Sequence, residues 1–302
     1  MSIIVTGASG QFGRAAAERL IKMAPPGELI LTTRRPEQLA DLASAGAQVR
    51  YADFDDPASL ATAFKGGTKM LLISTARAGS RLQQHKNAIE AAKAAGVGHV
   101  AYTSFVNARK PGNPSVECFD HRDTEIFLEQ SGMAFTHLRD SHYAEAVAMI
   151  IAPIAILAGR LPTSAHDGVE AMVSRDDCAA AAVAVLTTPG HENKAYDLTG
   201  PELLSIPQAV QMIRELSGKP VVADYVSDDD MFAHFDALGF PRQASDHVDP
   251  ERPWSSDGMV TFERAIREGY FAVISNDVEK LTGRKPKSLR DVLVQYQAMW
   301  PA

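Results

Sequence analysis

Two spacings of apolar residues alternate along the first third of the chain. Short aliphatic and β-branched runs predict strands, and they lie at residues 3–5, 29–33, 48–51, 69–74 and 99–104. Segments with apolar residues at helical spacing lie between them, at residues 11–23, 36–45, 57–64 and 81–95. The first unit of strand, helix and strand spans about thirty residues, the size of one crossover unit, and the rhythm then repeats. The pattern therefore predicts an α/β fold with a doubly wound parallel sheet.

The pattern is less regular after residue 105. A polar segment rich in Pro and Gly occupies residues 107–115, and it precedes a predicted helix near 120–130 and a predicted strand at 134–138. The segment 245–258 is rich in Pro and charge, and we expect a loop or a lid there. A smaller C-terminal α/β lobe is therefore predicted to follow the sheet.

Composition and charge exclude several classes of protein. The 302 residues are 45% hydrophobic and 22% charged, as in an ordinary globular protein, and the net charge of −7 argues against a nucleic-acid-binding surface. Cys118 and Cys178 are too few for a disulfide framework and lack a zinc-like spacing, so we expect reduced thiols in the cytoplasm and no metal. The longest apolar run, residues 144–158, is interrupted by Glu145 and Pro153 and is too short for a membrane span. The chain starts directly with a predicted strand, so we expect no signal peptide.

The first strand is followed at once by three glycines at regular spacing. Gly7, Gly10 and Gly13 form G-x-x-G-x-x-G between a predicted strand and a predicted helix, which is the context of the dinucleotide-binding fingerprint. Such glycines permit a tight turn, a close approach of the backbone to a pyrophosphate, and close packing of helix on strand. The alternative is a glycine turn that only connects two elements. The residues of this turn expected to bind a cofactor are Gly7, Ser9, Gly10, Gln11, Phe12 and Gly13.

The end of the second predicted strand indicates which dinucleotide binds. An NAD site usually has an acidic residue there, which accepts a hydrogen bond from the ribose 2′-hydroxyl. This chain has Arg34 and Arg35 instead, and guanidinium groups suit the 2′-phosphate of NADP. The alternative is a pair of solvated arginines. The sequence therefore predicts NADPH as the cofactor, with NADH less favoured and Arg34 as the better contact.

Two further strand ends are expected beside the cofactor. Asp53 follows the third strand, where it could bind the adenine amino group while Phe54 covers the ring. Asp53 is equally suited to cap the helix that begins at Pro57, and both readings stay open. The fourth strand ends in small polar residues where the chain must pass the ribose and phosphates, and these are Ser74, Thr75 and Ala76.

These segments together resemble the NmrA-like group of atypical short-chain dehydrogenases, and they are most similar to bacterial type 2 NADPH:quinone oxidoreductases and triphenylmethane reductases. The segments that carry the resemblance include V-T-G-A-S-G-Q-F-G, T-R-R-P, Y-A-D-F-D, L-L-I-S-T, A-Y-T-S, H-R-D-T-E, L-R-D-S-H-Y and S-R-D-D-C-A. The resemblance implies a Rossmann domain for NADP in residues 1–140, to which part of 185–200 returns, and a mainly substrate-binding lobe in 141–302. It also implies a small aromatic or quinone acceptor, or alternatively a regulatory NADP(H) sensor without catalysis, and it leaves open a homodimer.

The expected proton donor differs from that of ordinary short-chain dehydrogenases, which use Tyr-x-x-x-Lys with a Ser. Ser104 ends the fifth strand, but no Tyr-x-x-x-Lys follows it. By resemblance, His121 stands where related reductases carry a lysine, and a histidine can donate a proton or a hydrogen bond to a developing oxyanion. The alternative is a helix-surface pair between His121 and Glu125, four residues later.

The sixth predicted strand ends in L-R-D-S-H-Y, at the edge of the sheet where ligands bind. His142 and Tyr143 offer flat rings for an aromatic acceptor, although both could simply pack the helix that follows. Phe105, at the end of the fifth strand, is assigned to the substrate side, and Tyr143 is counted with His121 and Ser104 as catalytic. Related quinone reductases have Asn-Gly-Trp-Tyr where this chain has Asp-Ser-His-Tyr, which leaves the acceptor open.

Overall fold

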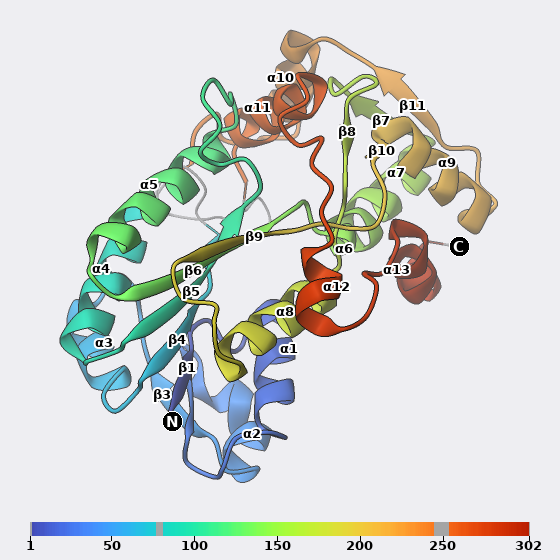
Figure 1. Ribbon diagram of the computed structural model, residues 1–302. Coiled ribbons are helices and arrows are strands. Elements are labelled where there is room, and N and C mark those ends of the chain that lie inside the picture. The colour runs from blue at the N-terminus through green and yellow to red at the C-terminus, as the bar shows by residue number, and fades with distance from the viewer. Residues whose placement is uncertain (1, 77–80, 245–253, 302) are drawn as a thin grey trace.

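The protein is built around one seven-stranded parallel sheet (Figure 1). The computed structural model describes residues 2–76, 81–244 and 254–301. The strand order is β3-β2-β1-β4-β5-β6-β9. The strands are β1 (Ile3–Val5), β2 (Leu29–Thr33), β3 (Gln48–Tyr51), β4 (Lys69–Leu72), β5 (His99–Phe105), β6 (Ala134–Asp140) and β9 (Lys194–Leu198). The order runs outward from β1 in both directions, so the predicted doubly wound fold is confirmed, with its switch point between β1 and β4.

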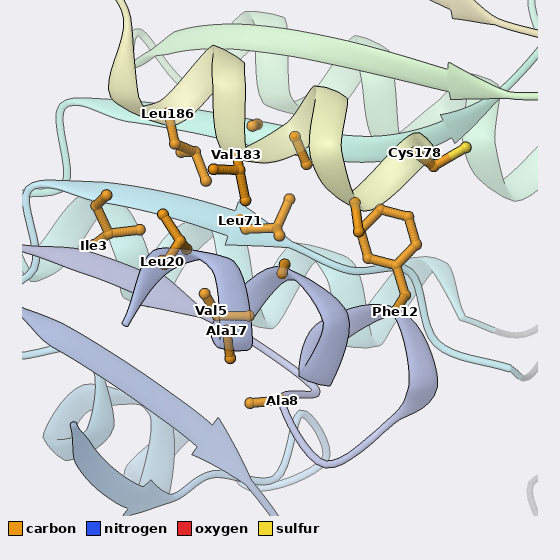
Figure 2. Packing of buried hydrophobic residues seen from close by; sticks show 14 of the residues in the cluster. Ile3, Val5, Ala8, Phe12, Ala17, Leu20, Leu71, Cys178, Val183 and Leu186 are labelled. Carbon is orange, nitrogen blue, oxygen red and sulfur yellow. The ribbon is translucent and has the colours of Figure 1, made fainter. Parts of the chain in front are cut away.

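One face of the sheet is covered by α1 (Gln11–Leu20), α8 (Arg175–Thr187) and α12 (Asp277–Thr282). Figure 2 shows Leu20 of α1 opposite Val183 and Leu186 of α8, with the strand residue Leu71 near them and Ala17 in the same cluster. These side chains are at least nine-tenths buried and aliphatic, and their removal from water stabilises the layer. Thus α8 and α12, from the second half of the chain, pack on the first half.

The other face of the sheet is covered by α3 (Pro57–Ala63), α4 (Leu82–Ala94) and α5 (Val116–Gln130). Its core includes Phe64, Met70 and Ile89. The helix predicted near 120–130 begins earlier than expected, at Val116 after the N-cap residue Ser115. Asp120 therefore lies in the second turn and does not start the helix.

The remaining elements form a lobe beyond the carboxyl ends of the strands, with its own core. Its strands pair as β7 with β11 in parallel and as β8 with β10 antiparallel. They are β7 (Arg160–Thr163), β8 (Val169–Glu170), β10 (Leu204–Ser205) and β11 (Val222–Tyr225). The helices are α6 (Ala144–Ala146), α7 (Ala152–Ala158), α9 (Ile206–Ser217), α10 (Asp228–Ala237), α11 (Ser256–Arg267) and α13 (Leu289–Tyr296). A helix long and apolar enough to cross a membrane does not occur among the described residues. Most of the predicted loop or lid at 245–258 falls outside them.

Two predicted elements differ in detail from the structure. The helix predicted at 36–45 is a 3₁₀ turn, Pro36–Leu39, followed by the short α2, Ala40–Ser44. The strand predicted at 69–74 ends at Leu72, because side-chain hydroxyls replace the backbone partners there. The amide of Ile73 donates to Oγ1 of Thr6, and that of Ser74 donates to Oγ1 of Thr103.

Candidate functional site

The glycine turn connects β1 to α1 with very little space around it. Gly7 has φ +57°, a conformation that glycine adopts without strain, and its carbonyl accepts a hydrogen bond from the amide of Gly10 at 2.9 Å. A Cβ on Gly13 would lie 2.4 Å from the carbonyl oxygen of Gly7, whereas one on Gly10 would lie 3.3 Å from it. Gly13 therefore permits the helix to pack on the turn, and α1 begins at Gln11 with its first amides uncapped by any side chain.

The two arginines after β2 are exposed, as a cofactor contact requires. Neither Arg34 nor Arg35 makes an ion pair with a carboxylate of the described chain. The turn before them is fixed by Thr33, whose Oγ1 accepts from the amide of Arg35 at 3.1 Å and lies 2.7 Å from Oγ of Ser9. Ser9 therefore links the glycine turn to the strand end that carries the arginines.

The third strand end is held by local hydrogen bonds. Asp56, and not Asp53, caps α3 by accepting from the amide of Ala58. The Asp53 carboxylate accepts from the amide of Asp55, and Phe54 packs partly buried against the core of that face. Asp53 is thus not needed as a helix cap, and its role toward an adenine stays a prediction.

The segment after β4 is anchored to α4. Oγ1 of Thr75 donates to Gln84, and the amide of Thr75 donates to Nε2 of His85 at 3.2 Å. Ser74 is tied to β5 through Thr103, while Ala76 is exposed. The structure places these small residues at the carboxyl end of β4, directly beside β1.

Ser104 is part of a buried ionic network behind the sheet. Its Oγ donates to Oε1 of Glu125 at 2.6 Å, and Arg139 donates two hydrogen bonds to the same carboxylate. Burial alone would raise the pKa of Glu125, but the hydrogen bond and charge of Arg139 lower it. The hydroxyl of Ser104 therefore has a structural partner, and the predicted pair between His121 and Glu125 does not form.

His121 lies buried on α5 and contacts the sheet. Its Nδ1 is 2.9 Å from the hydroxyl of Tyr102, and its ring lies 6.1 Å, between centroids, from that of Phe105. Burial lowers the pKa of His121 well below its ordinary value, and the cation of Arg81 lowers it further. The ring is therefore neutral at neutral pH, so it can donate a hydrogen bond but is not a charged acid.

Arg81, just before α4, is a buried cation whose charge acts on this group. It is paired with Glu117 and Asp120, and it donates to the carbonyl of Thr75. The cation thus ties the segment after β4 to α5, and it adds to burial in lowering the pKa values of His85 and His121.

A cluster of aromatic side chains extends from the end of β5 into the C-terminal lobe. Phe105 meets Phe262 of α11 edge to face at 5.7 Å between centroids and Phe271 at 5.1 Å. His142 meets Phe262 at 5.1 Å, again edge to face. Two predicted substrate residues, Phe105 and His142, are therefore brought together by Phe262.

His142 is also held by a buried carboxylate. Its Nδ1 lies 3.0 Å from Oε1 of Glu170, which is fully buried. Burial acts to lower the pKa of His142, but the charge of Glu170 and its hydrogen bond together raise this pKa above its ordinary value. The ring is thus fixed at the junction of the sheet with the lobe.

Tyr143 lies against the glycine turn. Its ring centroid is 6.4 Å from that of Phe12, and the guanidinium of Arg175 lies 4.8 Å from its ring. Arg175 also donates to Gln11 at 2.7 Å, so α8 holds the turn from the other side. The hydroxyl of Tyr143 donates to Oδ2 of Asp140 at 2.6 Å. Tyr143 therefore presents its ring, and not its hydroxyl, toward the cofactor turn.

One cluster of possible metal ligands lies behind the sheet. Ligand atoms of Glu125, Glu129 and His137 lie within 4.8 Å of one another. However, Arg139 binds Glu125 and Arg109 binds Glu129, so cations already neutralise both carboxylates. We assign no metal to it.

Several residues of the site could not be read from the sequence. Tyr102 sits inside an ordinary apolar strand, and Phe262 lies more than 150 residues from its partner Phe105. Arg175 and Asp140 lie in segments that carry the family resemblance, but nothing in the sequence assigns them a role at the site. The segment A-Y-T-S could have indicated Tyr102 as a site residue. Residues two apart on a strand face the same side of the sheet, so Tyr102 shares a face with Ser104.

Comparisons with known proteins agree with this geometry. Residues 7–189 match the model of a family described as NAD(P)H-binding. Quinone oxidoreductase 2 of Escherichia coli strain K12 is 38% identical over 244 residues, which cover 81% of this chain and 84% of that protein. A crystal structure of an NADPH-dependent quinone oxidoreductase from Escherichia coli, complexed with NADPH, superposes with a TM-score of 0.87 at 34% identity, covering 97% of this chain and 99% of that one. Triphenylmethane reductase of Citrobacter sp. superposes with a TM-score of 0.85 at 31% identity, covering 99% and 100%.

The fold and the glycine turn define a Rossmann-type, NAD(P)H-dependent reductase. Within that class the chain belongs to the NAD(P)H-binding family whose model it matches, and the resemblance to quinone oxidoreductases and triphenylmethane reductases is confirmed.

Proposed function

We propose that the protein uses NADPH to reduce a quinone or a similar flat, conjugated aromatic acceptor. The observation that carries this proposal is the convergence of His121 and the aromatic cluster at the carboxyl end of β5. This strand end lies next to β4, which pairs in turn with β1, the strand that leads into the predicted cofactor turn.

The residues present fit a dinucleotide. Gly13 leaves no room for a side chain between helix and turn, and the free amides at the start of α1 suit a pyrophosphate. The exposed and unpaired guanidinium of Arg34 suits a 2′-phosphate, with Arg35 as a second cation. NADPH would supply a hydride from its nicotinamide ring, and a proton taken up from solvent would complete the hydroquinone.

The acceptor would lie against rings that the protein already holds in place. Phe105 and Phe262 offer edges and faces for a planar molecule, and His142 is fixed beside them by Glu170. Orientation of the acceptor over the nicotinamide could supply much of the rate, since the anion formed from a quinone is delocalised. We place the donor of His121 near the developing oxyanion.

The experiment measures the KM values of a benzoquinone and of NADPH in the wild type and in two variants that each lack one aromatic ring. Substitution Phe262→Ala should raise the KM of a benzoquinone several-fold and leave the KM of NADPH unchanged. Phe235→Ala is the matched control, because Phe235 meets Phe240 in the same edge-to-face geometry on α10, within the C-terminal lobe. Equal KM values for the quinone in all three proteins would contradict the proposed acceptor position.

The location and assembly of the protein stay predictions. Cys118 and Cys178 are buried free thiols, which supports a cytoplasmic site without testing it.

A further inference from the structure

We infer that Tyr102 fixes the tautomer of His121, so that His121 presents Nε2–H as a neutral donor. The identity of the partner, an oxygen of the acceptor, rests on the proposed function. The tautomer itself follows from hydrogen bonds of the protein.

The chain of hydrogen bonds begins at a backbone amide. The N–H of Thr75 can only donate, and it lies 3.2 Å from Nε2 of His85, so that nitrogen carries no hydrogen. His85 is fully buried, and burial together with Arg81 lowers its pKa to about 3. A neutral ring with a bare Nε2 must carry its hydrogen on Nδ1.

The hydrogen on Nδ1 of His85 is accepted by Thr124. Its Oγ1 lies 2.9 Å away, and the hydroxyl of Thr124 donates in turn to the carbonyl of Asp120 at 2.7 Å. The hydroxyl of Tyr102 is 3.4 Å from the same Nδ1, which already bears a hydrogen and cannot accept from it. His85 is therefore excluded as an acceptor for Tyr102.

Tyr102 also contacts Thr124, but the hydroxyl of Thr124 already pairs with Nδ1 of His85 and donates to the carbonyl of Asp120. The nearest available acceptor for the hydroxyl of Tyr102, among the described residues, is therefore Nδ1 of His121, at 2.9 Å. Burial raises the pKa of Tyr102, so its hydroxyl keeps its hydrogen. Because His121 is neutral and accepts at Nδ1, its hydrogen is on Nε2. That atom donates to no described residue, and it is the atom left for a ligand.

The charged groups around His121 also favour its neutral form. The cation of Arg81 opposes protonation of either histidine, while Glu117 and Asp120 are paired with Arg81 itself. The carboxylate of Glu125, one turn further along α5, is bound by Arg139 and Ser104. No unpaired anion among these neighbours favours the charged imidazolium.

The test is the nitrogen-15 NMR spectrum of the imidazole rings in the cofactor-free protein at neutral pH. His121→Gln identifies the His121 signals among the nine histidines. We expect wild-type His121 to be neutral with its hydrogen on Nε2, and Tyr102→Phe to give a mixture of tautomers. Tyr196→Phe is the matched control, because Tyr196 lies 2.9 Å from Nδ1 of His191 in the same kind of pair, and it should leave His121 unchanged.

A second readout measures turnover. Tyr102→Phe should lower kcat for a quinone about tenfold, the size of one lost neutral hydrogen bond, with the KM of NADPH unchanged.

A wild-type His121 that is charged, or protonated on Nδ1, would overturn the inference, and this result needs no folded variant. Retention of Nε2–H in Tyr102→Phe would remove Tyr102 from its positioning role. Absence of any turnover in the wild type would contradict only the proposed function, because the tautomer is measured without it.

Discussion

The phenol of Tyr143 donates its hydrogen to the buried carboxylate of Asp140 over 2.6 Å. Burial raises the pKa of Asp140 to about 7, although hydrogen bonds from Tyr143 and Cys178 act to lower it. A carboxyl group that titrates near neutral pH therefore lies behind the ring that faces the glycine turn.

This pKa predicts how stability depends on pH. The folded state binds a proton at Asp140 up to about pH 7, whereas the unfolded chain loses it near pH 3.8, so the contribution of Asp140 to wild-type stability falls as pH rises between the two values. Asp140→Asn cannot ionise and accepts the same bond from Tyr143. The difference in free energy of unfolding, variant minus wild type, should rise with pH by up to ~1.4 kcal/mol per pH unit across this interval. Above about pH 7 this difference should become constant. Denaturant unfolding at pH 5, 6, 7 and 8 measures it. A constant difference over that range would mean that Asp140 does not titrate there.

Arg34 should decide the choice between cofactors. Arg34→Ala removes the proposed contact to the 2′-phosphate, so the Kd of NADPH should rise roughly 10- to 150-fold while that of NADH hardly changes. Arg35→Ala should show the same bias more weakly. Arg160→Ala is the control, since Arg160 is exposed and pairs with Asp224 in the C-terminal lobe. Isothermal titration measures the three variants, and equal weakening of both cofactors would refute the assignment.

The glycine turn separates binding from folding. Gly10→Val should abolish binding of either cofactor with a small loss of stability, because its Cβ meets the Gly7 carbonyl oxygen at 3.3 Å. Gly13→Ala should lose binding and also about 1–3 kcal/mol of stability, because its Cβ would overlap the turn. Gly98→Ala has only an ordinary 3.8 Å contact and should keep both. Titration with cofactor, together with thermal unfolding, distinguishes these outcomes. Tight NADPH binding by a folded Gly10→Val variant would contradict binding of the pyrophosphate at the glycine turn.

His121 should matter most for acceptors that need their oxygen stabilised. His121→Ala should lower kcat for such an acceptor by about 10²–10³-fold, as when one oxyanion donor is removed, and a reactive benzoquinone should suffer much less. The KM of NADPH should stay the same. Because the pKa of His121 lies well below 6.5, the donor is intact at every pH above that value, so this residue adds no inflection to the rate there. If the His121→Ala variant reduces both acceptors at wild-type rates, His121 has only a structural role in α5.

The parallel sheet and the glycine turn could be predicted because their signals are local. The start of α5 could not, because the side chains that face the sheet from this helix include polar residues such as His121 and Glu125, which break the apolar periodicity. Their burial is compensated by Tyr102 from one strand and by Arg139 from another. Pairs formed across the fold in this way leave no pattern in the sequence.

The same reason limits the prediction of the site. Arg34 and the glycines could be found because each lies at a strand end. Phe262 comes from a helix of the lobe and meets Phe105 only after both units have folded. The sequence predicts a catalytic Tyr143, but it does not show that the hydroxyl of Tyr143 donates to Asp140 of the preceding strand.

The most direct test of the central claim is a single turnover without oxygen, in which the wild-type protein is mixed with NADPH and 1,4-benzoquinone and the loss of NADPH absorbance is followed. We predict that one hydroquinone forms for each NADPH oxidised, and that the Gly10→Val variant forms none above the rate without protein. Tight binding of NADPH with no oxidation by any quinone offered would contradict a reductase and favour a protein that only senses the nucleotide.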